Sequence, residues 1–261
     1  MDLPDIRLGT TPVVLDERPM ARRVGLLALA TDHTSEVDFR RMVASESVGV
    51  YVTRVAYANP TTPETLRRLL PLLTEGAALI LPREPLDAVY FACTAASVVI
   101  GDDAVEQAIQ HAKPGVPVIT PPLAARRGFR ALGVRRISLL TPYTVATTAP
   151  MLRYFANAGL DVVSCICLGL DDDREMARIS RASLIAAARE ALAADAEALF
   201  ISCTGVRSAA VVGEIEQATG RPVVTSNQAG AWMALRLGGD ITPRPRFGRL
   251  MTCVTTGGDG A

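Results

Sequence analysis

The chain of 261 residues has few of the side chains on which several enzyme classes depend. Lysine occurs once, at Lys113, and histidine occurs twice, at His33 and His111. A lysine Schiff base therefore has a single candidate, and the histidines are too few for the usual zinc ligand sets. We expect no metal site.

Neither sign of charge is in excess, and no long apolar run occurs. Lysine plus arginine and aspartate plus glutamate number 27 each, so a nucleic-acid partner is not expected. No apolar run reaches the ~18 residues that a membrane span needs, and charges interrupt even the alanine-rich stretch 182–203. Asp2 and Asp5 open a chain start without a signal-peptide pattern. We expect a cytoplasmic protein without a membrane partner.

Cysteine is scarce as well, with five residues in the chain. An odd count without dense spacing argues against a disulfide framework, so we expect reduced thiols. Cys165 and Cys167 alternate along one predicted strand, which is typical of small apolar residues in a sheet.

Two short stretches, 89–97 and 198–208, resemble each other. Each is an apolar strand-like run that ends at a Cys-Thr pair and leads through small residues into a helix-like segment. Free N–H groups at a helix N-terminus lower the pKa of a thiol and bind anions. We therefore predict that Cys93 and Cys203 are reactive, although a cysteine at a buried strand end is often only a small apolar residue.

The whole pattern of strands and helices occurs twice. Cys93 and Cys203 are 110 positions apart, and Pro117 and Pro222 are 105 apart. Strands are expected at 22–30, 48–55, 88–92, 116–120, 134–143, 160–168, 197–202 and 221–225, and helices at 36–45, 64–81, 102–112, 145–158, 179–194, 206–219 and 229–237. Strands that alternate with helices predict two α/β lobes, each a doubly wound parallel sheet, related by a pseudo-twofold axis with an active-site cleft between them.

The duplication also divides the chain. We expect a leader at 1–21, an N-terminal lobe at 22–125, a C-terminal lobe at 126–228 and an irregular tail at 241–261. The last helix, at about 229–240, is expected to pack back on the N-terminal lobe.

The predicted strand ends place a site between the lobes. Ligands of open α/β sheets bind beyond the carboxyl ends of the strands, where Thr31, Cys93, Tyr143 and Cys203 lie. Two thiols on opposite walls suit a cofactor-free racemase or isomerase, in which one thiolate removes a proton or attacks a carbon atom and the opposite thiol returns a proton. The backbone N–H groups that follow the thiols can hold a carboxylate or a developing enolate; they belong to Thr94, Ala95, Thr204 and Gly205.

Other polar residues near these ends keep two interpretations each. Thr31 and Asp32 can contact substrate or cap the following helix, and Arg207 can pair with a carboxylate or face solvent. The acidic run 171–173 is typical of a loop before a helix, and His33 is given no role.

Three segments, 88–94, 140–143 and 198–205, resemble the aspartate/glutamate racemase superfamily over roughly residues 22–240. The chain is most similar to the branch of maleate cis–trans isomerase, arylmalonate decarboxylase and the ectoine-utilisation protein. The resemblance implies cofactor-independent chemistry at the two cysteines and a substrate carboxylate bound by Tyr143. Arylmalonate decarboxylase has glycine at the position of Cys93, so the resemblance favours an isomerase or racemase.

The chain also departs from maleate isomerase, which has asparagine near positions 31–32 and 171–174 and serine at the position of Ala95. Acidic residues there would repel a dicarboxylate, so the resemblance favours a small carboxylate or amino acid related to ectoine. A decarboxylase or another lyase, and a non-catalytic binding protein, remain alternatives. We expect a homodimer or homotetramer.

Overall fold

The computed structural model describes residues 3–254, which form two parallel β-sheets with helices around them. Each sheet has four strands, in the orders β2-β1-β3-β4 and β6-β5-β7-β8. The strands are β1 (Arg22–Leu29), β2 (Val48–Val55), β3 (Ala88–Phe91), β4 (Val118–Ile119), β5 (Arg136–Tyr143), β6 (Asp161–Leu170), β7 (Ala198–Ile201) and β8 (Val223–Thr225). All neighbouring strands run parallel, which confirms the predicted pair of parallel-sheet α/β lobes.

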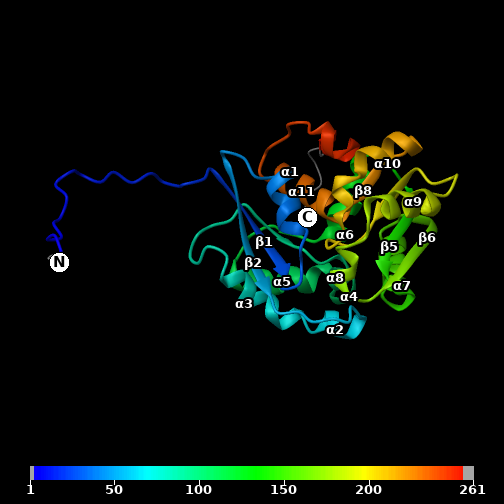
Figure 1. The fold of residues 1–261 in the computed structure, drawn as a ribbon, viewed down its shortest axis with the longest axis horizontal. Helices are drawn as coiled ribbons and strands as arrows, with labels where there is room; N and C mark the ends of the chain where they lie inside the picture. The colour runs from blue at the N-terminus through cyan, green and yellow to red at the C-terminus, as the bar shows by residue number, and fades with distance from the viewer. Residues whose placement is uncertain (1–2, 255–261) are drawn as a thin grey trace.

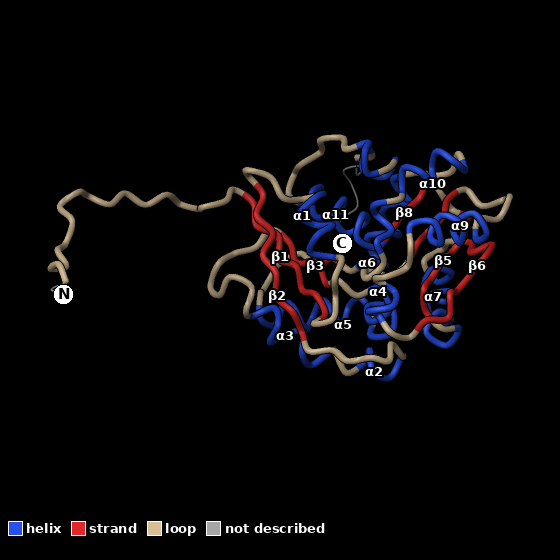
Figure 2. The backbone as a smooth tube through the Cα atoms, viewed as in Figure 1, coloured by secondary structure: helices blue, strands red, loops and turns tan. Residues whose placement is uncertain are grey.

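The helices lie on the faces of the two sheets and between them (Figures 1 and 2). The first half contains α1 (Ser35–Met42), α2 (Pro63–Arg67), α3 (Leu70–Ala78), α4 (Thr94–Ile100), α5 (Asp102–Ala112) and α6 (Pro121–Ala131). The second half contains α7 (Val145–Asn157), α8 (Asp173–Met176), α9 (Arg181–Ala191), α10 (Val212–Thr219) and α11 (Ser226–Leu237), with short 3₁₀ turns at Arg207–Ala210, Pro245–Phe247 and Arg249–Thr252.

The two lobes exchange one helix each. α6 follows β4 and α11 follows β8, so the two helices occupy equivalent places in the repeat, and they pack on each other. Phe129 of α6 meets Phe200 of β7 edge to face, with ring centroids 6.2 Å apart. Gly230 of α11 lies directly against the ring of Tyr90 in β3. Each lobe therefore completes the core of the other, and the lobes are held at a fixed separation.

Local chemistry explains where the observed helices differ from the predicted ones. The predicted helix 64–81 is two helices, α2 and α3, because Pro71 lacks an N–H and its ring opposes the carbonyl of Arg67. The predicted helix 206–219 starts with a 3₁₀ turn before α10. The sequence analysis missed α6, which spans the predicted boundary between residues 125 and 126.

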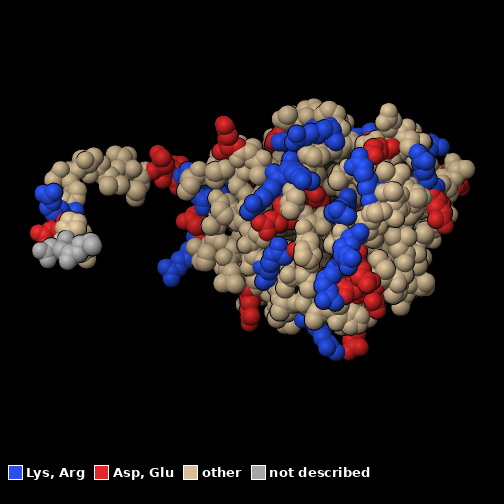
Figure 3. Space-filling model, viewed as in Figure 1, with Lys and Arg blue, Asp and Glu red and all other residues tan. Residues whose placement is uncertain are grey.

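The chain ends extend beyond this body. Residues 3–21, within the predicted leader, form an exposed arm without helix or strand (Figure 1). Of the predicted tail 241–261, residues 255–261 lie outside the described residues, and the rest contains only 3₁₀ turns. Basic and acidic side chains are intermixed over the face in Figure 3. Between residues 3 and 254 no helix is long and apolar enough to cross a membrane.

The contact between α11 and β3 generates a stability prediction. A Cβ at Gly230 would lie 2.3 Å from the Tyr90 ring, so Gly230→Ala is expected to destabilise the protein by about 1–3 kcal/mol. Gly213→Ala is the matched control, because a Cβ there has nothing within 4 Å and alanine favours the helix. Urea unfolding of both variants measures the difference; equal midpoints would contradict the tight contact.

Candidate active site

A pocket lies where the carboxyl ends of strands from both sheets meet. The space between its atoms measures about 430 Å³ when the solvent-filled mouth is counted. The lining residues come from both lobes: Leu29, Thr31, Asp32, His33, Tyr57, Thr61, Leu66, Cys93, Ala95, Tyr143, Asp173, Met176, Cys203, Thr204 and Gly205. The pocket therefore occupies the place that the strand order predicts for a ligand.

Both predicted cysteines line this pocket. Cys93 follows β3 and Cys203 follows β7, which are the equivalent strands of the two sheets. Each residue is only 6% exposed. The fold thus brings two free thiols from equivalent strand ends to one enclosed space.

Cys203 has an unusual backbone and several hydrogen-bond donors. Its φ of +87° lies in the left-handed region, which a non-glycine residue adopts at a cost of about 1–3 kcal/mol. Burial raises the pKa of the thiol to about 11, while the hydroxyl of Tyr143 and the N–H groups of Gly205 and Val206 lower it. These three donors all favour the thiolate.

Cys93 has less support for its thiolate. Burial raises its pKa well above the usual range, and only the N–H of Ala96 opposes this shift. The negative charges of a Cys203 thiolate, Asp32 and Asp173 raise the pKa of Cys93 further. The expectation that helix N-termini give low-pKa thiols is therefore wrong here, because burial outweighs the backbone donors at both cysteines.

Of the other predicted contacts, Thr31, Ala95, Tyr143, Thr204 and Gly205 line the pocket. Thr94 does not, because its hydroxyl donates to Ser226 Oγ of α11 at 2.8 Å.

The Thr204 hydroxyl donates to the carbonyl of Ala92 at 2.9 Å. The hydroxyls of both Cys-Thr pairs thus join the lobes.

Contacts decide between the two interpretations of Asp32 and Arg207. Asp32 lines the pocket, but Oδ1 accepts the N–H groups of Thr34 and Ser35 at 2.7 and 2.8 Å, so it caps the start of α1. Burial raises its pKa. His33 is exposed at the pocket wall. Arg207 is exposed outside the pocket, and it donates to the carbonyl of Ile179.

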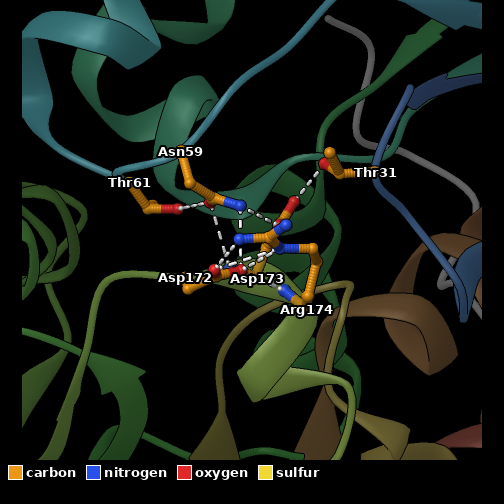
Figure 4. Close-up of polar contacts among 6 residues, drawn as sticks. All are labelled: Thr31, Asn59, Thr61, Asp172, Asp173 and Arg174. Carbon is orange, nitrogen blue, oxygen red and sulfur yellow. Dashed lines mark hydrogen bonds and ion pairs between the residues drawn. The ribbon is translucent and has the colours of Figure 1, made fainter.

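A group of polar contacts lies at one side of the pocket, and it includes Asp173 of the acidic run that was interpreted as a loop before a helix (Figure 4). Asp173, at the start of α8, accepts hydrogen bonds from the Thr31 hydroxyl and from Asn59 Nδ2, the latter at 2.7 Å. The Thr61 N–H donates to the carbonyl of Asp171 at 2.6 Å. These bonds join the loop after β2 to the loop after β6. We call residues 59–61 and 171–173 the clasp.

The missed lining residues share one sequence signal. Tyr57 and Thr61 follow β2, and Asp173 and Met176 follow β6, so all four lie beyond strand ends. Cys93 was assigned to the site because ligands bind beyond the carboxyl ends of parallel strands. The same rule, applied to the outer strands β2 and β6, would have assigned these four residues as well. Among the described residues, no group of three or more histidine, cysteine, aspartate or glutamate side chains is placed to hold a metal ion.

Comparison with known proteins identifies the family. The family model described as arylmalonate decarboxylase matches residues 74–251, which is more than half of the chain. The chain belongs to the arylmalonate decarboxylase family. This membership confirms the resemblance to the aspartate/glutamate racemase superfamily.

The relatives of this family member include a decarboxylase and several isomerases. The arylmalonate decarboxylase of Bordetella bronchiseptica is 37% identical over 139 residues, which span 52% of this chain and only 58% of that enzyme. The maleate isomerase of Nocardia farcinica is 27% identical over 241 residues, 88% of this chain and 95% of that one. A structure of the Nocardia farcinica maleate cis–trans isomerase with a covalently bound succinylcysteine intermediate has a TM-score of 0.78 at 24% identity, covering 88% and 98% of the chains. The matches support an isomerase or a decarboxylase.

The backbone of Cys203 gives a stability prediction. Glycine adopts a φ of +87° without strain, so Cys203→Gly should be more stable than Cys203→Ala by about 1 kcal/mol. Cys93 has a φ of −152°, and there the alanine variant should be the more stable one. Urea unfolding of the four variants checks both signs; the same order at both positions would contradict the geometry.

The hydroxyl of Tyr143 gives a pH prediction. Only the thiolate reacts with iodoacetamide, so labelling of Cys203 should rise with pH toward its pKa of about 11. Tyr143→Phe removes a donor that lowers this pKa, so labelling at pH 9 should slow by about tenfold. Mass spectrometry of the labelled peptide measures the rate. Tyr154→Phe is the control, because the Tyr154 hydroxyl bonds Asp102 and Tyr154 does not line the pocket; it should leave the labelling rate of Cys203 unchanged.

Proposed function

We propose that this family member is a cofactor-independent racemase or isomerase of a small carboxylate or amino acid, with Cys93 and Cys203 as its catalytic pair. One observation carries the proposal: the thiols at two equivalent strand ends line the same pocket. A proton removed by one thiolate can then be replaced by the opposite thiol.

The surroundings of the thiols favour different roles for them. Cys203 has three donors that favour its thiolate, so it serves as the base that takes a proton from the α-carbon. Cys93, whose thiol form is favoured more strongly, donates its proton to the opposite face of the resulting carbanion. The pair ends with the thiolate on Cys93, and the reverse reaction restores the first state. Nothing is oxidised or reduced.

The substrate carboxylate has neutral partners in this pocket. Ala95 and Thr204 line the pocket, and their backbone N–H groups are not among the donors to either sulfur. Donors of this kind can stabilise the charge that develops on a carboxylate during α-proton removal. An ectoine-derived acid as the substrate remains a prediction from the sequence resemblance.

The same pair can also act covalently. In the Nocardia farcinica structure the bound species is a succinylcysteine. That protein is a cysteine-to-serine mutant, so its succinyl group is on a remaining cysteine. By analogy, one thiolate of the pair that adds to an unsaturated acid, with the other thiol as proton donor, would form a C–S bond and later break it.

A decarboxylase is the second candidate, favoured by the family match and by the 37% identity to the Bordetella bronchiseptica enzyme. A decarboxylase needs only one thiol, to protonate the carbanion that remains after CO₂ leaves. Because this pocket has a second buried thiol, Cys93, it favours racemisation or isomerisation, in which thiols act on both faces of the substrate.

The experiment follows single enantiomers of small acids in D₂O. We expect the enzyme to exchange the α-proton and form the opposite enantiomer without releasing CO₂, as read by NMR and chiral chromatography. Cys93→Ala and Cys203→Ala should each reduce racemisation by about 10²–10⁴-fold, because each removes one acid–base group.

Cys165→Ala is the matched control, since Cys165 lies in β6 and does not line the pocket. Racemisation that survives either active-site substitution would contradict the two-thiol mechanism. Release of CO₂ from substituted malonic acids, without racemisation of any acid tested, would establish the decarboxylase instead.

A further inference from the structure

The charged groups of the pocket have one sign. Asp32 and Asp173 line it, and none of its lining residues is a lysine or an arginine. Two carboxylates in an enclosed space repel a second carboxylate on a substrate and attract a cation.

The two carboxylates differ in the number of hydrogen bonds that they already accept within the protein. Asp32 accepts three hydrogen bonds, from the N–H groups of Thr34 and Ser35 on Oδ1 and from the Ser35 hydroxyl on Oδ2. Asp173 accepts two, from Asn59 on one oxygen and from Thr31 on the other. A carboxylate offers about four lone-pair positions, so Asp173 keeps more acceptor capacity beside the cavity than Asp32 does.

The nearby arginine serves a different carboxylate. Arg174 Nε donates to both oxygens of Asp172, at 2.9 and 3.0 Å, and its Nη2 binds the same group. Asp173 is close enough to raise the pKa of Arg174, but Asp172 is the larger cause. Asp173 therefore has neutral hydrogen-bond donors and no ion-pair partner of its own among its described contacts.

The clasp holds this carboxylate in place. The side-chain oxygen of Asn59 accepts the N–H of Asp173 at 3.1 Å while its Nδ2 donates to the carboxylate, so the two residues bind each other twice. A receptor fixed in this way needs little ordering when a ligand arrives, which strengthens binding.

Resting on the proposed cysteine site, we infer that Asp173 binds a cationic amino group of the substrate, with Asn59 and Thr31 as its positioning residues. The substrate class is then a small acid that carries an ammonium group, and acids with two carboxylates and no cation are excluded. The ammonium donates to Asp173 while the substrate carboxylate faces the neutral donors beside Cys203.

Binding of such a cation also assists the chemistry. The charge of Asp173 is one cause of the raised pKa of Cys93. An ammonium group placed between them offsets that charge, so a substrate with an amino group favours the thiolate state of Cys93 that each turnover must pass through.

Protection of Cys203 tests this inference without requiring turnover. Iodoacetamide labelling of Cys203 is measured at pH 9 with pairs of acids that differ only by the amino group: alanine and propionate, 2-aminobutyrate and butyrate, aspartate and succinate. We expect protection by at least one amino acid at concentrations about tenfold or more below those of its partner, as for a charge-assisted hydrogen bond.

Asp173→Asn should remove this difference within a pair, and Asp173→Glu should restore part of it. Glu175→Gln is the matched control, because it removes a charge from an exposed position of α8 outside both the clasp and the pocket lining. Thermal melting confirms that each variant is folded.

Two results would overturn the inference. In the first, acids without an amino group protect as well as their partners, or no amino acid protects. In the second, Asp173→Asn keeps the preference for amino acids. Failure of this inference can be told apart from failure of the proposed function. If the enzyme racemises an acid without an amino group and Cys93→Ala abolishes that activity, the proposed function holds and this inference fails. If no acid is racemised but amino acids still protect selectively, this inference holds and the proposed function fails.

Discussion

The hydrogen bond from the Thr204 hydroxyl to the carbonyl of Ala92 joins the segments that carry the two thiols. Asn227 of α11 strengthens the junction, since its Nδ2 donates to the carbonyl of Thr204 at 2.8 Å and to Asp38 at 3.0 Å. Because these groups are buried, leaving one unpaired would cost about 1–3 kcal/mol, so the lobes are strongly favoured in this one arrangement. The pocket between Cys93 and Cys203 depends on that fixed arrangement.

The same burial that fixes the thiols makes their ionised forms costly. Water is excluded from the strand ends, and this desolvation is the largest cause of the raised pKa at both cysteines. Acid–base chemistry at a carbon atom works best when the pKa of the catalytic group lies near the working pH. Burial therefore favours the protonated form of both thiols, in a pocket that is lined by two carboxylates and by no lysine or arginine.

Sequence patterns predicted the sheets well, because a buried parallel strand appears as an apolar run that ends at polar residues. β2 has the predicted bounds, and both cysteines were found because the motif occurs twice. α6 was missed because Pro121 and Pro122 resemble a loop, although proline is favourable in the first turn of a helix and Thr120 caps this one. The acidic run 171–173 was noted, but the role of Asp173 stayed open because its approach to Thr31 depends on how the lobes pack, which local patterns do not contain.

Duplication placed the thiols symmetrically, and local structure then made them different. Cys93 leads directly into α4 with an extended backbone, whereas Cys203 leads into a turn with a φ of +87°. That strained turn presents the N–H groups of Gly205 and Val206 to the Cys203 sulfur, while at Cys93 only Ala96 does so. A symmetric pair would have no reason to favour a proton on either sulfur. The asymmetry gives the proposed reaction a defined starting state, with the better-stabilised thiolate on the side that also holds Tyr143.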